Sequence, residues 1–273
     1  MRQREQLVQN ASQNCELPPL NSIDSQHSRT EMANTSNFKE AIRQAQSKSL
    51  VGPNVIPKAL PFVGGGLILT ALGTYGGLGV AQAYPQIFMP TVIGAMVLEL
   101  ALFFVAQGAA QSEDNAKALP MLVLYSLLTG YTLTGLISVA LAVPGVGFWG
   151  IGMAALGCGI TFIAARQIGS NLSETDGFAL AQTVQLGIIG LVVVMAAQLL
   201  FALFGVHTPT YLELAISALG AVIFAGAAVV DFYTLPRTYN DEQYLAASMS
   251  MYLTYVNLFV FILRFLIAFN SRD

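Results

Sequence analysis

The sequence has few charged residues, few histidines and few cysteines. Only 10% of its 273 residues are Asp, Glu, Lys or Arg, whereas a soluble domain carries about 25%. Cys15 lies in a polar tail and Cys158 in an apolar run, so neither a structural disulfide nor a CxxC metal or redox motif is expected. His27 and His207 lie in polar or loop contexts and do not support a histidine metal site or a Ser/His catalytic pair.

These shortages exclude several classes of function. The net charge is −3 and the basic residues are dispersed, which argues against a nucleic-acid partner. The sequence contains no HExxH, no GxSxG and no aspartate pair with the spacing of a membrane protease. We therefore expect neither an enzyme nor a cofactor. The last lysine is Lys117, so a retinal Schiff base in the final apolar segment is also excluded.

Apolar residues, in contrast, are abundant and are arranged in long runs. They make up 55% of the chain, and the mean hydropathy is +0.62. After residue 56 the sequence offers seven segments near the roughly 20 residues that cross about 30 Å of hydrocarbon. We predict an all-α, polytopic membrane domain over residues 57–270. Its spans are expected at 57–80, 88–110, 119–142, 147–165, 181–204, 211–235 and 244–268.

Residues 1–56 differ in composition from the rest. They are rich in Gln, Asn and Ser and lack an early apolar core, which predicts a polar, largely disordered tail; no secretory signal peptide is expected. One short helix is expected from Asn37, with Phe38, Ile42 and Ala45 on a common face. It is either a helix that lies on an anionic membrane surface or a linker helix without lipid contact.

The distribution of Lys and Arg predicts the orientation. With the N-terminus in the cytoplasm, ten basic residues lie on the cytoplasmic side, and only Arg264 and Arg272 lie on the other side. The three outer loops contain no Lys or Arg. The positive-inside rule therefore predicts a cytoplasmic N-terminus and an external C-terminus.

The connections and the glycines predict a compact bundle. The third and fourth spans are joined only by residues 143–146, which predicts a tight antiparallel hairpin. Glycine is frequent in the first and fourth spans, where small residues let helices approach closely. The first span contains Gly64, Gly65, Gly66, Gly73, Gly76 and Gly77, and the fourth contains Gly150, Gly152, Gly157 and Gly159.

Two acidic residues within the spans are the candidates for function, because an intramembrane charge is costly unless it is paired or hydrated. Glu99 lies mid-span and is either a functional group or a protonated carboxyl that is hydrogen-bonded to a neighbouring helix. Asp231 lies at least one turn inside the cytoplasmic end of the sixth span. It is either the gate of a polar path or a headgroup anchor paired with Arg237.

Three further polar positions are interpreted from their place along the spans. Thr254 lies about 15 Å along the seventh span, close to the depth of Glu99, and Asn257 lies one turn beyond it on the same face. Glu213 is expected to be a first-turn acid favoured by the helix dipole. Arg166 and Arg264 end their helices and are expected to extend to the lipid headgroups.

Taken together, these segments resemble the Bax inhibitor-1 (transmembrane Bax inhibitor motif) family, in particular its bacterial YccA-like members. The resemblance runs from the first span to the seventh and leaves out the polar tail. The order and spacing of five stretches carry it: 127–136, 154–163, 167–173, 219–231 and 252–259.

The resemblance implies a seven-helix bundle with the last helix at its centre. It also implies a pH-sensitive calcium leak, in which aspartates on the sixth and seventh helices form a hydrogen-bonded pair. Asp231 matches the first aspartate, but Thr254 stands where the second is expected. A carboxylate and a threonine do not titrate as a coupled acid pair.

This departure leaves two hypotheses for the response to pH. If Thr254 donates its hydroxyl to Asp231, gating by pH is expected to be weaker or shifted to acidic pH. If Glu99 supplies the missing acid, pH dependence is expected to survive and to be lost in Glu99→Gln.

The resulting functional prediction is a calcium or other cation leak in the bacterial inner membrane. Asp231, Thr254, Glu99 and Asn257 are its candidate pathway residues. The alternative is a non-conducting regulator that contacts a membrane-bound protease or another membrane protein through the polar tail. The lipid bilayer is the expected environment in both cases.

Overall fold

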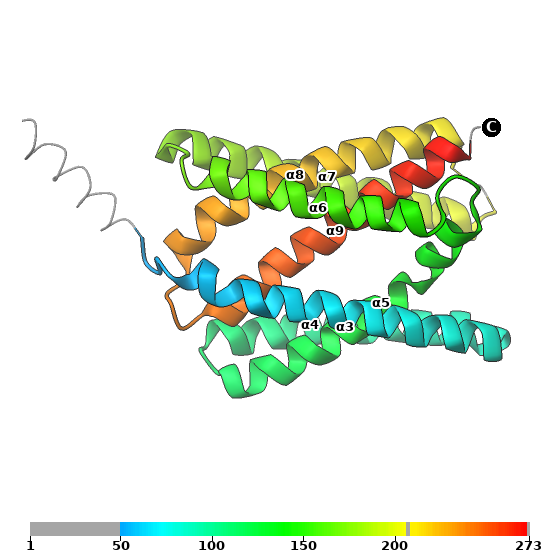
Figure 1. Cartoon of the computed structure of the whole chain (residues 1–273), viewed down its shortest axis with the longest axis horizontal. Coiled ribbons are helices and arrows are strands. Elements are labelled where there is room, and N and C mark those ends of the chain that lie inside the picture. The colour runs from blue at the N-terminus through cyan, green and yellow to red at the C-terminus, as the bar shows by residue number, and fades with distance from the viewer. Residues whose placement is uncertain (1–49, 206–207, 272–273) are drawn as a thin grey trace, which may run out of the picture. The chain divides into compact units, whose positions relative to one another are not determined.

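The structure is a computed structural model, which describes residues 50–205 and 208–271. The described part is all helical and contains seven long helices, labelled α3 to α9 in Figure 1. They are α3 (Val55–Ala83), α4 (Pro85–Gln111), α5 (Asn115–Ala142), α6 (Gly147–Gly169), α7 (Glu174–Leu203), α8 (Thr210–Thr238) and α9 (Tyr244–Asn270). The helix expected near Asn37 lies outside the described residues.

All seven helices are long and apolar enough to cross a membrane, which confirms the predicted number and order of spans. A helix satisfies its backbone donors and acceptors internally, as a segment in hydrocarbon must. Most of the helices extend a few residues beyond the predicted spans at one or both ends. Polar residues at these ends continue the helix past the apolar run, as in α7, whose first turn contains Glu174 and Asp176.

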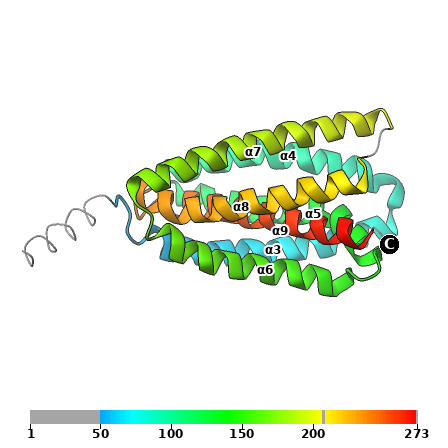
Figure 2. The same ribbon diagram turned by 90° about the horizontal axis from the view of Figure 1, so that it is seen from above.

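Helix α9 is the centre of the bundle, as the resemblance implied. It packs against α3, α4, α5, α6 and α8. In Figure 1 it crosses diagonally between α6, α7 and α8 on one side and α3, α4 and α5 on the other. Figure 2 places α4 and α7 on one flank of α9, with α3 and α6 on the other. Its buried side chains include Tyr252, Met251 and Phe261, so the core is built around this helix.

Helices α3 and α5 approach closely because small residues meet there. A Cβ atom on Gly130 would lie 2.0 Å from the carbonyl oxygen of Thr70, and one on Gly73 would lie 2.1 Å from that of Leu127. A Cβ atom on Gly66 would lie 3.0 Å from the hydroxyl oxygen of Ser126 on α5 and 3.0 Å from a ring carbon of Tyr252 on α9. Close packing through small residues is thus confirmed for this interface.

Four of the seven glycines in the first span, however, do not serve this contact. Open space lies where a side chain would be at Gly64, Gly65, Gly76 and Gly79. Residues recurring every three or four positions share a helix face, so of the run Gly64–Gly66 only Gly66 faces α5 and α9. In the fourth span, a Cβ atom on Gly152 or Gly159 would likewise meet no neighbour.

The turn between α5 and α6 is as short as predicted. Gly145 has φ +82°, a backbone conformation that favours glycine. Beyond the turn the two helices contact different neighbours, because α5 packs mainly on α3 and α4, whereas α6 packs mainly on α8 and α9. Helices α5 and α6 are therefore joined by a tight turn but pack on each other less than on these neighbours, so they form a less tight hairpin than the sequence predicted.

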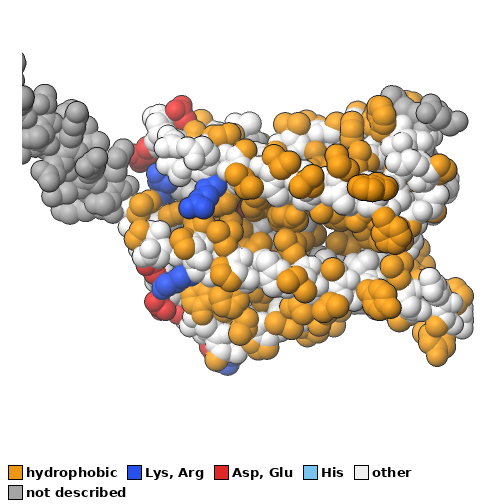
Figure 3. Space-filling model, in the orientation of Figure 1, with side chains coloured by type: hydrophobic (Ala, Val, Ile, Leu, Met, Phe, Trp, Pro, Cys, Tyr) orange, Lys and Arg blue, Asp and Glu red, His pale blue; other side chains and the backbone are white. Residues whose placement is uncertain are grey.

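Charged side chains gather at the end of the bundle where α3 begins, as Figure 3 shows for one face. The amides of Val51 and Gly52 both donate to the carbonyl oxygen of Pro236, at 2.9 and 3.0 Å. Asn54 donates twice to the carboxylate of Asp241, at 2.9 and 3.0 Å, and these bonds hold the pKa of Asp241 below its ordinary value. The start of α3 is thereby fastened to the α8–α9 connection.

Candidate functional site

Asp231 links α8 to α9 inside the bundle. Thr254 donates to its Oδ2 at 2.6 Å, and Ser250 donates to its Oδ1 at 2.9 Å. Ser250 and Thr254 are one turn apart on α9, so both hydroxyls face α8. Asp231 and Thr254 are 8% and 7% exposed. The structure therefore meets the condition of the first pH hypothesis, in which Thr254 donates to the carboxylate.

Ser250 is the member of this site that sequence analysis missed. It lies four residues before Thr254, and that spacing was the available signal, since a hydroxyl one turn away shares the same helix face. Arg237, the other partner considered for Asp231, is engaged elsewhere. It donates to the carbonyl oxygen of Tyr233, and its guanidinium lies 4.1 Å from the centroid of the Tyr233 ring.

Glu99 lies between α4 and α5 and is half-buried. Its carboxylate accepts hydrogen bonds from Thr129 at 2.6 Å and from Thr132 at 3.1 Å. This geometry corresponds to the hypothesis of a carboxyl group bonded to a neighbouring helix. The structure thus brings Glu99 to threonines of α5 and Asp231 to hydroxyls of α9, as two separate polar contacts.

Asn257 is half-buried on α9 and donates to the carbonyl oxygen of Leu253 in its own helix, at 2.9 Å. The structure does not bring its amide to the carboxylate of Asp231. In the described residues, no group of three or more His, Cys, Asp or Glu side chains is placed to hold a metal ion.

A second charged contact lies toward the opposite end of the bundle. Arg264 Nε donates to Glu213 Oε1 at 2.7 Å, and Gln198 Nε2 donates to Glu213 Oε2 at 3.1 Å. The expectation that Arg264 extends to the headgroups is therefore wrong, because a carboxylate on α8 lies within its reach. Glu213 does lie in the first turn of α8, as predicted.

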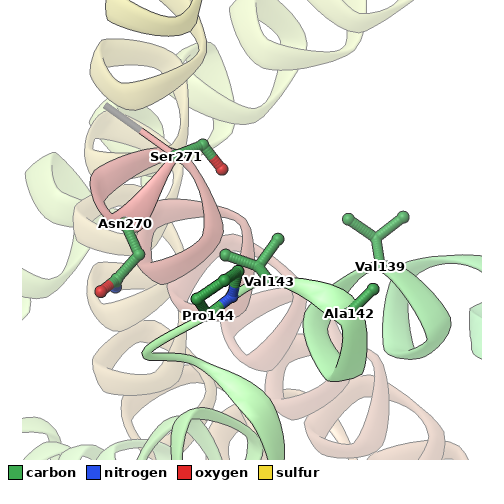
Figure 4. Close-up of a pocket in the computed structure, with 6 residues that line it drawn as sticks. All are labelled: Val139, Ala142, Val143, Pro144, Asn270 and Ser271. Carbon is green, nitrogen blue, oxygen red and sulfur yellow. The ribbon is translucent and has the colours of Figure 1, made fainter. Parts of the chain in front are cut away.

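Two cavities open at this end. The smaller, of about 280 Å³, has Glu213, Arg264, Thr208 and Thr210 in its wall. The larger, of about 550 Å³, lies where the α5–α6 turn meets the end of α9, and Figure 4 shows its lining. Val139 and Ser271 line both cavities, so they adjoin.

Comparison with known proteins decides the family. The family model described as "Inhibitor of apoptosis-promoting Bax1" matches residues 52–271, which include all seven helices. The chain belongs to the Bax inhibitor-1 family. The sequence-based resemblance is thereby confirmed, and the match includes both the Asp231 site and the Glu213–Arg264 pair.

Relatives in this family occur in bacteria and in yeast. An uncharacterized membrane protein of Streptococcus pyogenes serotype M6 is 34% identical over 178 residues, which cover 63% of this chain and 72% of the relative. An uncharacterized protein of Borreliella burgdorferi is 23% identical over 236 residues, 82% of this chain and 96% of its own length. Bax inhibitor 1 of Schizosaccharomyces pombe is 28% identical over 131 residues, 43% of this chain and 48% of the yeast protein.

Proposed function

We propose that this protein is a cation leak pathway of the bacterial cytoplasmic membrane, with calcium as the expected cation and Asp231 as its gate. The observation that supports this proposal best is the carboxylate of Asp231, buried between two membrane-spanning helices and bonded to Thr254 and Ser250. An ionisable group inside a membrane domain is costly and by default marks an ion or substrate path.

The geometry gives Asp231 a means of opening and closing the proposed cation path. Both of its hydrogen bonds go to α9, the central helix, so they fasten α8 to the core of the bundle. Water or a cation that takes over the carboxylate oxygens would release both hydroxyls together. Carboxylate oxygens are preferred calcium ligands, so the same group can attract the ion and control the contact.

The proposed setting follows the charge distribution. The end of the bundle where α3 begins, which holds four of the five Lys and Arg residues that the structure describes, faces the cytoplasm. The Glu213–Arg264 end faces outward. We propose no enzymatic activity and no cofactor for the chain. Partners other than the lipid bilayer and the conducted cation are not needed for the leak.

The test is calcium efflux from liposomes that contain the purified protein, at pH 6, 7 and 8. Asp231→Asn keeps the shape of the side chain but removes its charge. We expect efflux to fall about tenfold, which corresponds to losing about 1.4 kcal/mol of attraction for the cation. Asp176→Asn, the same substitution in the first turn of α7, is the matched control and should leave efflux unchanged.

Two outcomes would count against the proposal. Efflux equal to that of protein-free liposomes at every pH, from demonstrably folded protein, would overturn it. The next hypothesis would then be a non-conducting regulator that binds a membrane protein through residues 1–56. Equal efflux from wild type and Asp231→Asn would keep the leak but remove Asp231 as its gate.

A further inference from the structure

Helix α7 has an exposed side that contains two glutamines. Gln182 and Gln185 are three residues apart, so they share one side of the helix, and both are exposed. The opposite side of α7 contains the buried Val184 and Leu191. Helix α7 packs mainly on α8, and in Figure 2 it lies at the edge of the bundle. The two glutamines therefore lie on the side of α7 that faces away from α8.

Both glutamines lie well inside the membrane-spanning part of the bundle. A Cβ atom on Gly187 of α7 would lie 3.1 Å from the side chain of Ile223. Ile223 is in the middle of α8, which spans residues 210–238. Gln185 precedes Gly187 by two residues, and Gln182 lies about one turn closer to the start of α7. We therefore place both amides at the depth of the hydrocarbon core.

An amide in contact with hydrocarbon is costly, because lipid tails offer it neither a donor nor an acceptor. In the part of the chain that the structure describes, neither Gln182 nor Gln185 has a hydrogen-bond partner for its amide. The other glutamine of α7, Gln198, donates to Glu213 of α8 at 3.1 Å. Thr183 donates to a backbone carbonyl of its own helix at 2.9 Å. The two exposed amides thus need a partner from another molecule.

The same side of α7 allows another helix to approach closely. Leu186, Ile189 and Gly190 follow Gln182 by four, seven and eight residues, so they lie along one stripe. Leu186 and Ile189 are 70% and 53% exposed, and a Cβ atom on Gly190 would meet nothing within 4 Å. Small residues that permit close approach and amides that bond across helices are typical of contacts between membrane helices. These four residues and Gln185 form the α7 outer face.

We propose that the α7 outer face is the contact between two copies of this chain, in which Gln182 and Gln185 hydrogen-bond their own counterparts. Two copies inserted in the same orientation pair about a two-fold axis along the membrane normal, so each residue near the axis meets its own copy. An amide has two donor hydrogens and an acceptor oxygen, so two glutamines satisfy each other. The contact is separate from the Asp231 site, and the inference does not depend on the proposed leak.

Disulfide cross-linking tests the location of the contact. In the full chain with Cys15→Ser and Cys158→Ala, a single cysteine replaces Leu186 on the α7 outer face or Ile163 on α6. Ile163 is the matched control, because its side chain is 75% exposed but lies on another helix. A disulfide requires Cα atoms within about 7 Å of each other. When membranes of the producing cells are oxidised with copper phenanthroline, we expect a cross-linked dimer of Leu186→Cys and none of Ile163→Cys.

A second measurement tests the role of the amides. Full chains labelled with a donor or an acceptor dye, at a cysteine that replaces Ser112 in the same cysteine background, are mixed in liposomes. Energy transfer is followed as added lipid dilutes the protein. We expect Gln182→Leu/Gln185→Leu to weaken association about tenfold, because leucine has no hydrogen-bonding group.

Gln82→Leu is the matched control for the loss of an amide. Gln82 is exposed in the last turn of α3, at the end of the bundle, where water and headgroups can satisfy its amide. Its substitution should leave association unchanged. The unfolding temperature in detergent checks that each variant is folded, which we expect of the double variant because both of its leucines face away from α8.

Three outcomes would overturn the proposal. The first is a Leu186→Cys chain that forms no dimer, or no more dimer than Ile163→Cys. The second is equal association of wild type and the folded Gln182→Leu/Gln185→Leu variant, which would show that the amides do not join two copies. The third is a cross-link from Leu186→Cys to a different membrane protein without a dimer, which would assign the α7 outer face to another partner.

Discussion

At the scale of single residues, the carboxylate of Asp231 is the point at which one side chain joins two helices. It accepts hydroxyl hydrogen bonds from Ser250 and Thr254, and neither donor can itself become negatively charged under ordinary conditions. The resemblance to the family implied a second aspartate at position 254. Threonine there keeps the hydrogen bond but removes the second titrating group.

Thr254→Asp should therefore strengthen the response to pH. Two carboxylates that share a proton titrate as a coupled pair, whereas one carboxylate with a hydroxyl does not. We expect calcium efflux from liposomes that contain the wild-type protein to change little between pH 6 and pH 8. In Thr254→Asp we expect a change of about three- to tenfold over the same interval.

Thr254→Ser is the control for this substitution, because it retains the hydroxyl that bonds Asp231. Its pH profile should match that of wild type. A Thr254→Asp profile as flat as that of wild type would show that a carboxyl at this position does not couple to Asp231. A steep wild-type profile that disappears in Glu99→Gln would instead support Glu99 as the second acid.

At the scale of helices, α3 and α5 approach each other closely through small residues. Gly130 allows the backbones to meet, and Thr74 donates to the carbonyl oxygen of Gly130 at 2.9 Å. In a membrane, packing and interhelical hydrogen bonds must hold helices together, since lipid is as apolar as the side chains. Small residues on this face are therefore required by contact rather than by backbone conformation.

Gly130→Ala should weaken this contact. The added methyl would lie 2.0 Å from a backbone oxygen, so the two helices must separate. We expect a loss of about 1–3 kcal/mol in the free energy of unfolding, seen as a lower unfolding temperature in detergent.

Gly76→Ala is the matched control on α3, because a Cβ atom there meets nothing within 4 Å. It should be neutral or stabilising by up to about 1 kcal/mol, since alanine favours a helix over glycine. A loss equal to that of Gly130→Ala would mean that general helix properties, not the α3–α5 contact, determine the effect.

At the scale of the whole molecule, the Lys and Arg residues are distributed unequally between the two ends of the bundle. Lys58, Lys117, Arg166 and Arg237 lie toward the end where α3 begins, and Arg264 lies toward the other. The end where α3 begins is fastened by hydrogen bonds such as those from Asn54 to Asp241. This unequal distribution predicts one orientation in the membrane.

Cysteine labelling would test that orientation. In a variant with Cys15→Ser and Cys158→Ala, single cysteines replace Ser112 in the α4–α5 connection or Pro144 in the α5–α6 turn. A membrane-impermeant maleimide should label Pro144→Cys in intact spheroplasts and Ser112→Cys only after lysis. The reverse pattern would invert the predicted topology.

The sequence could predict one hydrogen-bond partner of Asp231, but not its second partner or the partners of Glu99. Asp231 and Thr254 could be paired in advance because the family resemblance placed them on adjacent helices. Ser250, whose only signal was its spacing, was missed. The partners of Glu99 remained open, because a single mid-span acid does not indicate which neighbouring helix supplies its hydrogen bonds.

The sequence by itself determined the number, order and approximate length of the membrane helices. This was possible because hydrocarbon demands long apolar segments with internally bonded backbones, and both properties are local. The tertiary structure alone decided that Arg264 meets Glu213, that Gly66 but not Gly64 meets α9, and that two hydroxyls converge on Asp231. These contacts depend on how each helix is rotated about its axis, and that rotation is set by packing between segments far apart in the chain.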